Sequence, residues 1–256
     1  MMGKLLKYDF KAGIRIFGFI WLGIVLMTGV TCGIFAITSE GNTAMLTMGI
    51  FTVLPLYLLI MGSLVFPFVY ASTRFYKGLL GQEGYLMFTL PTEPWKLLTS
   101  KLLTAILFVL GTIAVAVGAM IASIATMATA TGATGVSIDG ILGMDLFSDG
   151  EVILAILHYC FAGIRLILQI YLALCLGHLC RGKRLLFAVL FFFALNTATN
   201  ILTSLLRIIT VENYYNAGID ALTGNLYSYT LPLNVGLCVL FFFLCERILR
   251  TRLNLE

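Results

Sequence analysis

Long apolar runs separated by short polar connections dominate the hydrophobic pattern of this chain. They predict six membrane-spanning helices, at residues 17–38, 44–70, 102–128, 152–179, 185–209 and 229–248. Each run has at least about the 20 residues that a helix needs to cross about 30 Å of hydrocarbon. A membrane β-barrel would show short segments of alternating polarity instead. The pattern therefore predicts an all-α integral membrane protein, with residues 1–256 forming a single transmembrane domain.

Composition excludes an ordinary soluble protein. Apolar residues make up 60% of the chain and charged residues 11%, against about 45–50% and roughly 25% in soluble domains. Only lipid can cover so much apolar surface beside so few charges. The six cysteines lie inside or beside the apolar runs, and we interpret them as small apolar residues rather than a disulfide framework.

The distribution of charge predicts the topology. Basic residues gather at both termini and in the second and fourth connections, whereas the other three connections contain acids and no Lys or Arg. The basic residues are Lys4, Lys7, Lys11, Arg15, Arg74, Lys77, Lys96, Lys101, Arg181, Lys183, Arg184, Arg247, Arg250 and Arg252. By the positive-inside rule, both termini are cytoplasmic. We expect a multi-pass protein of the cell membrane, and no nucleic-acid partner.

Residues 1–16 have two faces at helical spacing. Lys4, Lys7, Lys11 and Arg15 recur on one face, and apolar residues such as Phe10 recur on another. This pattern predicts an amphipathic helix lying in the cytoplasmic interface. The alternative is a basic start that merely orients the first span.

The connection at residues 71–101 combines charge, glycine and aromatic residues, as in the segment RFYKGLLGQEGYLMFTLP that begins at Arg74. Apolar residues at 75, 76, 79 and 80 would line one face of a two-turn helix, which Gly81 and Gly84 then end. Such a helix favours contact with a protein partner. The alternative is that its apolar residues pack on the protein's own helices or dip into the headgroups.

This segment, between spans two and three and after a basic amphipathic start, resembles the ABC-2 type permeases of Gram-positive bacteria. The resemblance covers the whole chain in architecture and is sharpest over residues 74–103. Glu83, Gly84 and Tyr85 match the family's pattern, whereas Gln82 stands where the family has an acidic residue. The chain's size also suggests the permeases that export phenol-soluble modulins, which are amphipathic cytolytic peptides.

The resemblance implies a type V ABC exporter-like fold, with an elbow helix at residues 1–16 and a coupling helix in the loop at 71–101. The residues expected to contact the ATPase are Arg74, Phe75, Tyr76, Lys77, Leu79, Leu80, Glu83, Gly84 and Tyr85. The implied partners are two copies of a cytosolic ATPase, a second permease copy or paralogue, membrane lipid, and an amphipathic peptide or hydrophobic substrate. ATP and magnesium would bind the ATPase, and this chain would bind no cofactor.

No enzymatic centre is expected in this chain. The segment Gly177–Arg184 approaches a Walker A motif, but Arg184 replaces the Ser or Thr that holds magnesium and no strand precedes the segment. Cys175, His178 and Cys180 do not share one helical face well, so no metal site is expected. The ATPase should therefore be a separate chain.

Arg165 lies deep in span four, where an arginine costs about 2.5–3.5 kcal/mol on insertion scales. His158 and Gln169 share its face. Glu246, near the cytoplasmic end of span six, is the acid that could pair with Arg165. We favour an Arg165–Glu246 ion pair; a substrate or gating contact and a snorkelling arginine are the alternatives.

Span five carries a polar stripe on one helical face, composed of Asn196, Asn200, Thr203 and Ser204. Such a stripe lines a translocation path or makes hydrogen bonds between helices. In the family that the chain resembles, spans two and five border the path.

We therefore expect the permease subunit of an ATP-driven ABC exporter. A non-transporting immunity or sensor subunit bound to an ATPase is the main alternative. An intramembrane enzyme is a weaker one, since no catalytic cluster at one depth is evident.

Overall fold

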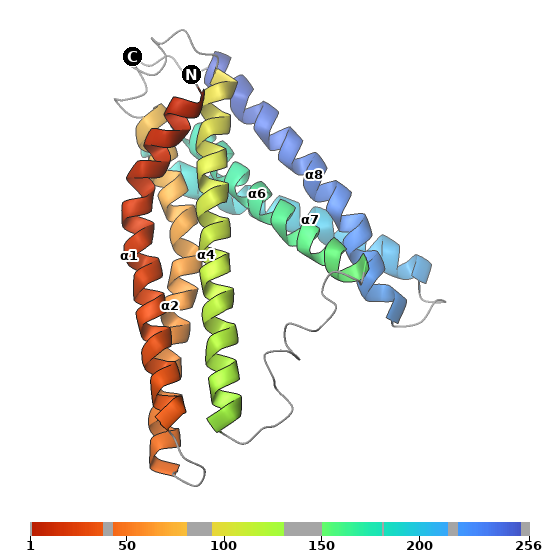
Figure 1. Cartoon of the computed structure of the whole chain (residues 1–256). Coiled ribbons are helices and arrows are strands. Elements are labelled where there is room, and N and C mark those ends of the chain that lie inside the picture. Colours follow the sequence, from red (N-terminus) through yellow and green to blue (C-terminus); the bar gives the residue numbers. More distant parts are fainter. Residues whose placement is uncertain are drawn as a thin grey trace. The chain divides into compact units, whose positions relative to one another are not determined.

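The computed structural model describes residues 2–37, 43–80, 94–130, 150–180, 182–214 and 220–251. The regular elements in these ranges are all helical (Figure 1). They are α1 (Met2–Ile37), α2 (Thr43–Phe75), the π-helix η1 (Tyr76–Leu80), α4 (Pro94–Ala130), α6 (Gly150–Leu179), α7 (Arg184–Tyr214) and α8 (Asp220–Thr251). The prediction of an all-helical protein is confirmed for these residues.

Six of the described helices are long and apolar enough to cross a membrane. Their candidate spans are Leu6–Ile37, Thr47–Leu79, Trp95–Ala130, Ile153–Leu179, Arg184–Leu206 and Thr230–Thr251. The number and order agree with the spans predicted from the sequence. Several helices extend beyond the predicted bounds, because a helix continues into the headgroup region after its apolar run has ended.

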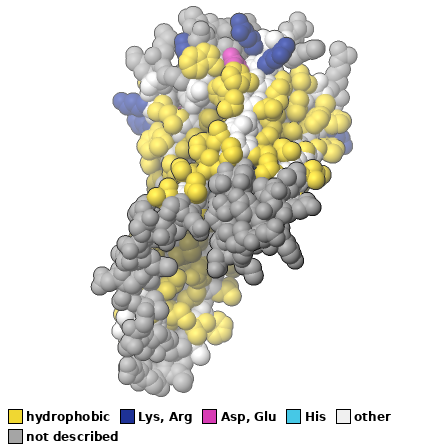
Figure 2. All heavy atoms as spheres, turned by 90° about the vertical axis from the view of Figure 1, so that its right-hand side faces the viewer, with side chains coloured by type: hydrophobic (Ala, Val, Ile, Leu, Met, Phe, Trp, Pro, Cys, Tyr) yellow, Lys and Arg dark blue, Asp and Glu magenta, His cyan; other side chains and the backbone are white. Residues whose placement is uncertain are grey.

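Large apolar side chains cover much of the described surface, as the space-filling view shows (Figure 2). Phe19, Phe51 and Phe193 are 75%, 79% and 62% exposed. A soluble monomer rarely exposes extensive contiguous apolar patches. The surface therefore fits a multi-pass membrane protein, in which lipid covers these side chains.

The chain divides into two compact units. Unit 1 comprises Met1–Tyr70 and Leu103–Leu146, and unit 2 comprises Ala71–Leu102 and Phe147–Glu256. The boundaries fall within α2 and within α4. The single transmembrane domain stays a prediction.

In unit 1, aromatic rings join the first helix to the other two. Phe17 of α1 stacks on Phe108 of α4 with ring centroids 4.2 Å apart, and Phe10 stacks on the same ring at 5.3 Å. Tyr70 of α2 meets both Phe17 and Phe108 edge-on. Gly13 leaves room for these rings, since a Cβ there would collide with Phe108. Stacked and edge-on pairs each contribute about 0.5–1.5 kcal/mol beyond their burial.

These contacts bear on the amphipathic segment predicted at residues 1–16. That segment is the first part of the continuous helix α1, with no break before the apolar run. Lys7, Lys11 and Arg15 are exposed, whereas Phe17 is fully buried. Phe10, from the predicted apolar face, stacks on Phe108 of α4 and is 38% exposed. The placement of this segment in a membrane interface stays a prediction.

Small and branched residues fill the remainder of the unit 1 core. Ile24 of α1, Leu56 and Ile60 of α2, and Ala116 and Ala119 of α4 form one buried cluster. The alanines bring the helix backbones close together, which is the main source of packing energy where lipid removes the hydrophobic drive.

Unit 2 is organised around α6, which contacts both α7 and α8. Leu168 and Leu172 of α6 pack with Cys238 and Phe241 of α8. Near the end of α6, Gly177 lies directly against the backbone of Ala188 on α7. The turn between these helices passes through Gly182, whose φ of 136° favours glycine.

Candidate functional site

The C-terminal end of α2 changes geometry without ending. After Phe75 the chain continues as the π-helix η1, from Tyr76 to Leu80. Isolated π-turns are rare and are frequent at functional sites. The sequence predicted a separate two-turn helix here, and the structure instead shows a single π-turn continuous with the second span.

Phe75 anchors this turn inside unit 2. Its fully buried ring stacks on Tyr171 of α6, with centroids 4.1 Å apart and planes 11° from parallel. The Tyr171 hydroxyl donates a hydrogen bond to the carbonyl oxygen of Lys101 on α4, at 3.4 Å. One tyrosine therefore links the end of α2, the start of α4 and the middle of α6.

Lys101 lies under the same turn. Its side chain is 8% exposed, and its Nζ lies 3.6 Å from the position that a Cβ on Gly78 would occupy. A cation near the carbonyl end of a helix is favourable. The ammonium group of Lys101 thus supports the turn from the inner side.

The structure divides the residues predicted to contact an ATPase into two groups. Phe75 and Leu79 are buried inside unit 2, so for these two the alternative interpretation, packing on the protein's own helices, is correct. Arg74 and Tyr76 are half-buried, and Lys77 is exposed. The side chain of Leu80 and the predicted contacts Glu83, Gly84 and Tyr85 lie outside the described residues. A buried helical face has the same sequence pattern whether its neighbour is a partner or the same chain, which is why the pattern did not separate the two groups.

In the middle of unit 2, Arg165 forms a hydrogen bond along its own helix. Its Nη1 donates to Oε1 of Gln169 at 3.1 Å. Gln169 is fully buried and donates in turn to the carbonyl oxygen of Phe192 on α7, at 3.5 Å. The predicted sharing of one helical face by Arg165 and Gln169 is confirmed. Nε of Arg165 is buried without a hydrogen bond among the described residues.

The proposed ion pair between Arg165 and Glu246 is not formed in the described part of the chain. Cys245, the neighbour of Glu246, has its Sγ 3.4 Å from Sγ of Cys175 on α6. Cys175 lies about 15 Å beyond Arg165 along that helix. Because α6 and α8 run in the same direction at this register, Glu246 stands at a different depth from Arg165.

Sequence reasoning missed a polar cluster at the other end of α6. Nδ1 of His158 lies 3.1 Å from Oγ1 of Thr230 and 3.4 Å from Nδ2 of Asn234, both on α8. Thr230 and Asn234 are 2% and 3% exposed. Their four-residue spacing on one face of the last span was the available signal, since paired polar residues in a span usually point inward.

The polar stripe of α7 lies beside the buried face of that helix. Asn196 and Thr203 are half-buried, whereas Asn200 and Ser204 are exposed. Thr203 donates to the carbonyl oxygen of Asn200 within α7, at 2.9 Å. The stripe is therefore partly open at the surface of unit 2, and its role as a path stays a prediction.

Two of the three candidate metal ligands, Cys175 and Cys180, have other contacts, whereas Nδ1 of His178 is buried without a hydrogen bond among the described residues. Cys175 contacts Cys245, and Cys180 donates to the carbonyl oxygen of Leu176. No group of three potential ligands gathers within the ranges that the structure describes. Gly177, from the near-match to a Walker A motif, lies within α6 and packs on Ala188.

Comparisons with known proteins add no family. No family model matches the chain, and neither a curated protein nor a solved structure matches it.

Proposed function

We propose that the chain is the permease subunit of an ATP-driven ABC exporter whose cargo is an amphipathic peptide. The observation that carries the proposal is the η1 turn, which stands in the one sizeable connection predicted to be cytoplasmic. Its outer surface presents Lys77 and part of Tyr76, and its inner side is fixed by Phe75 on Tyr171. A docking element needs both an accessible surface and a rigid anchor.

The anchor couples this turn mechanically to the membrane-spanning helices. A force on η1 would reach α6 through the Phe75–Tyr171 stack, and the start of α4 through the Tyr171–Lys101 hydrogen bond. Allosteric changes in packed helices proceed by such small rigid shifts of one element against another. Nucleotide-driven closure of two ATPase subunits is the proposed source of that force.

The other parts of the assembly follow from the same proposal. Two copies of the chain, or one copy and a paralogue, would form the path, with Asn196, Asn200, Thr203 and Ser204 of each facing it. ATP and magnesium would be held by the ATPase. The first turns of α1, which are continuous with the first span, would lie at the inner face of the cell membrane in place of a separate elbow helix, with both termini in the cytoplasm.

Co-purification with a candidate ATPase, such as one encoded by a neighbouring gene, tests the docking step. Lys77→Glu reverses an exposed charge on the turn, and Lys183→Glu makes the same change on the exposed turn before α7. We expect Lys77→Glu to reduce ATPase recovery about tenfold, equivalent to about 1.4 kcal/mol. Lys183→Glu should retain recovery, and equal losses in both variants would contradict docking at η1.

Transport is tested separately, in inside-out vesicles containing both subunits. ATP-dependent uptake of a fluorescent amphipathic peptide should be lost in a Glu83→Ala/Tyr85→Ala variant. Normal ATPase recovery with no uptake by the unmodified protein would instead support a non-transporting sensor or immunity subunit.

A further inference from the structure

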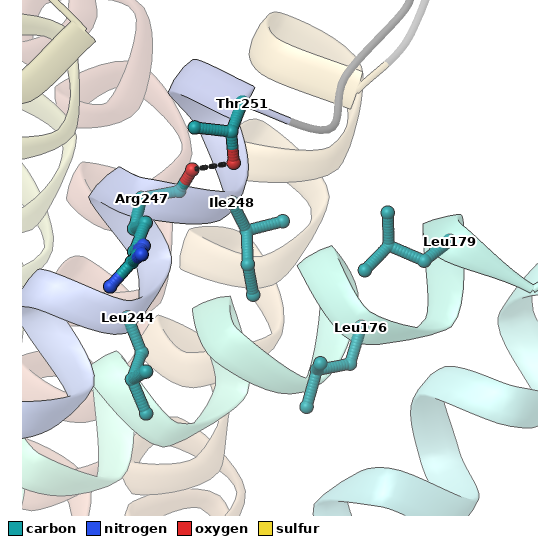
Figure 3. A pocket seen from close by; sticks show the side chains of 6 residues that line it. All are labelled: Leu176, Leu179, Leu244, Arg247, Ile248 and Thr251. Carbon is teal, nitrogen blue, oxygen red and sulfur yellow. Dashed lines mark hydrogen bonds between the residues drawn. The ribbon is translucent and has the colours of Figure 1, made fainter.

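An open groove lies where α6 and α8 end, within unit 2. Its volume is about 450 Å³, within the range of about 300–1,000 Å³ of small-molecule pockets. Four of the residues that line it are aliphatic, one is basic and one is a threonine (Figure 3): Leu176, Leu179, Leu244, Ile248, Arg247 and Thr251.

The floor of the groove is apolar and accessible. Leu179 and Leu244 are each 43% exposed, while Leu176 and Ile248 are half-buried and pack against the unit 2 core. Figure 3 shows Ile248 of α8 and Leu179 of α6 on opposite sides of the groove. Such a channel on a membrane-facing surface suits a hydrocarbon chain.

The described residues that line the groove include one cation and no acid. Arg247 is exposed and is the ionisable residue among those that line the groove. The hydroxyl of Thr251 donates to the Arg247 carbonyl oxygen at 2.6 Å within α8, so it is held on the helix backbone at this end of the groove. Lys183 and Arg184, exposed shortly after the end of α6, extend the basic character of this end of the helices.

The apolar floor matches the hydrocarbon part of a ligand, and the basic rim matches an anionic group on the same ligand. We propose that the groove binds an anionic glycerophospholipid of the cytoplasmic leaflet, with an acyl chain on Leu176, Leu244 and Ile248 and its phosphate at Arg247. Basic pockets between spans on the cytoplasmic side hold anionic headgroups by the same combination. The site is independent of the proposed export function, because α6 and α8 form it without a partner.

Native mass spectrometry of the purified full chain in a neutral detergent tests this site. The probes are dioleoylphosphatidylglycerol and dioleoylphosphatidylcholine, which share acyl chains and differ in net charge. We expect about fivefold more adduct with the anionic lipid, the ratio that one basic residue near an anionic surface provides. Arg247→Gln should remove the preference. Arg250→Gln, the same change at an exposed position of α8 outside the groove, should keep it.

Two further variants keep the test decisive if Arg247→Gln does not fold. Arg247→Lys retains the charge and should retain the preference, and Leu244→Trp should fill the groove and reduce both lipid adducts. Three results would overturn the site: an unchanged preference in Arg247→Gln, an equal loss in Arg250→Gln, or displacement of the lipid by free glycerol 3-phosphate, which would show binding of the headgroup alone. Loss of a dimer peak from the spectrum of Leu244→Trp would also overturn the site, because the groove would then be a contact between two copies of the chain.

Discussion

Within each of the two units, the helices are held together by a different kind of contact. In the described part of unit 1 the contacts between helices are mainly aromatic stacks and small apolar residues. Two hydrogen bonds join α1 and α4 there, from Trp21 to Thr112 at 3.2 Å and from Thr126 to Sγ of Cys32 at 3.5 Å. In unit 2, polar groups repeatedly cross from one helix to another, at His158, Gln169 and Tyr171. The same lipid environment thus accommodates two solutions to helix packing.

The difference indicates where rearrangement is least costly. Close-packed rings and alanines lose contact energy as soon as helices move apart. A polar group can exchange one partner for another during a shift, and hydrogen bonds between membrane helices average only about 0.6 kcal/mol. Unit 2 is therefore the better candidate for a moving part and unit 1 for a fixed one.

The largest expected effect comes from a substitution that breaks the aromatic packing of unit 1. Phe108→Ala removes a fully buried ring that contacts Phe10, Phe17 and Tyr70. It should cost about 3–5 kcal/mol of stability. Denaturation in detergent, followed by Trp21 fluorescence in a Trp95→Phe background, measures the loss. Phe51→Ala, at a ring that is 79% exposed, should be nearly neutral, and a similar cost there would contradict the packing assignment.

A smaller effect is expected from the polar interior of unit 2. Gln169→Leu leaves the Arg165 guanidinium without its acceptor and should cost about 2 kcal/mol. The temperature at which the buried thiols Cys175, Cys238 and Cys245 begin to react with a fluorescent maleimide measures this loss of stability. Adding Arg165→Met should restore most of the stability, because the orphaned charge is then gone. If the double variant is less stable than Gln169→Leu, the two residues are not coupled as described.

An effect of comparable size tests the contact between α6 and α7. A Cβ at Gly177 would lie 2.6 Å from the backbone nitrogen of Ala188, whereas a Cβ at Gly163, on the same helix, meets nothing within 4 Å. Gly177→Ala should therefore cost about 1–3 kcal/mol by overpacking. Gly163→Ala should stabilise by up to about 1 kcal/mol through helix propensity. The same thiol measurement applies, and a neutral Gly177→Ala would show that the helices separate easily.

The six spans could be predicted from sequence because each needs only its own apolar run. Contacts between spans could not, since they depend on register. Glu246 was the reasonable acidic partner for Arg165 by composition, yet the alignment of α6 with α8 places Cys245 beside Cys175. Arg165 instead donates to Gln169 on its own helix, the residue that the sequence placed on the same face. Burial of Phe75 was given only as the alternative interpretation, because its neighbour Tyr171 is distant in sequence and could not be identified from the pattern.

The unbroken first helix has a further consequence for bilayers of different thickness. With 36 residues, α1 is about 54 Å long, well beyond the hydrocarbon thickness of about 30 Å. Lys7, Lys11 and Arg15 are exposed at one-turn intervals, about 6 Å apart along the axis. As the bilayer thins or thickens, a different one of these cations reaches headgroup depth, and the flexible side chains absorb the remaining mismatch. We therefore expect α1 to tolerate bilayers that differ in thickness by about one helical turn, with one of these cations at headgroup depth in each.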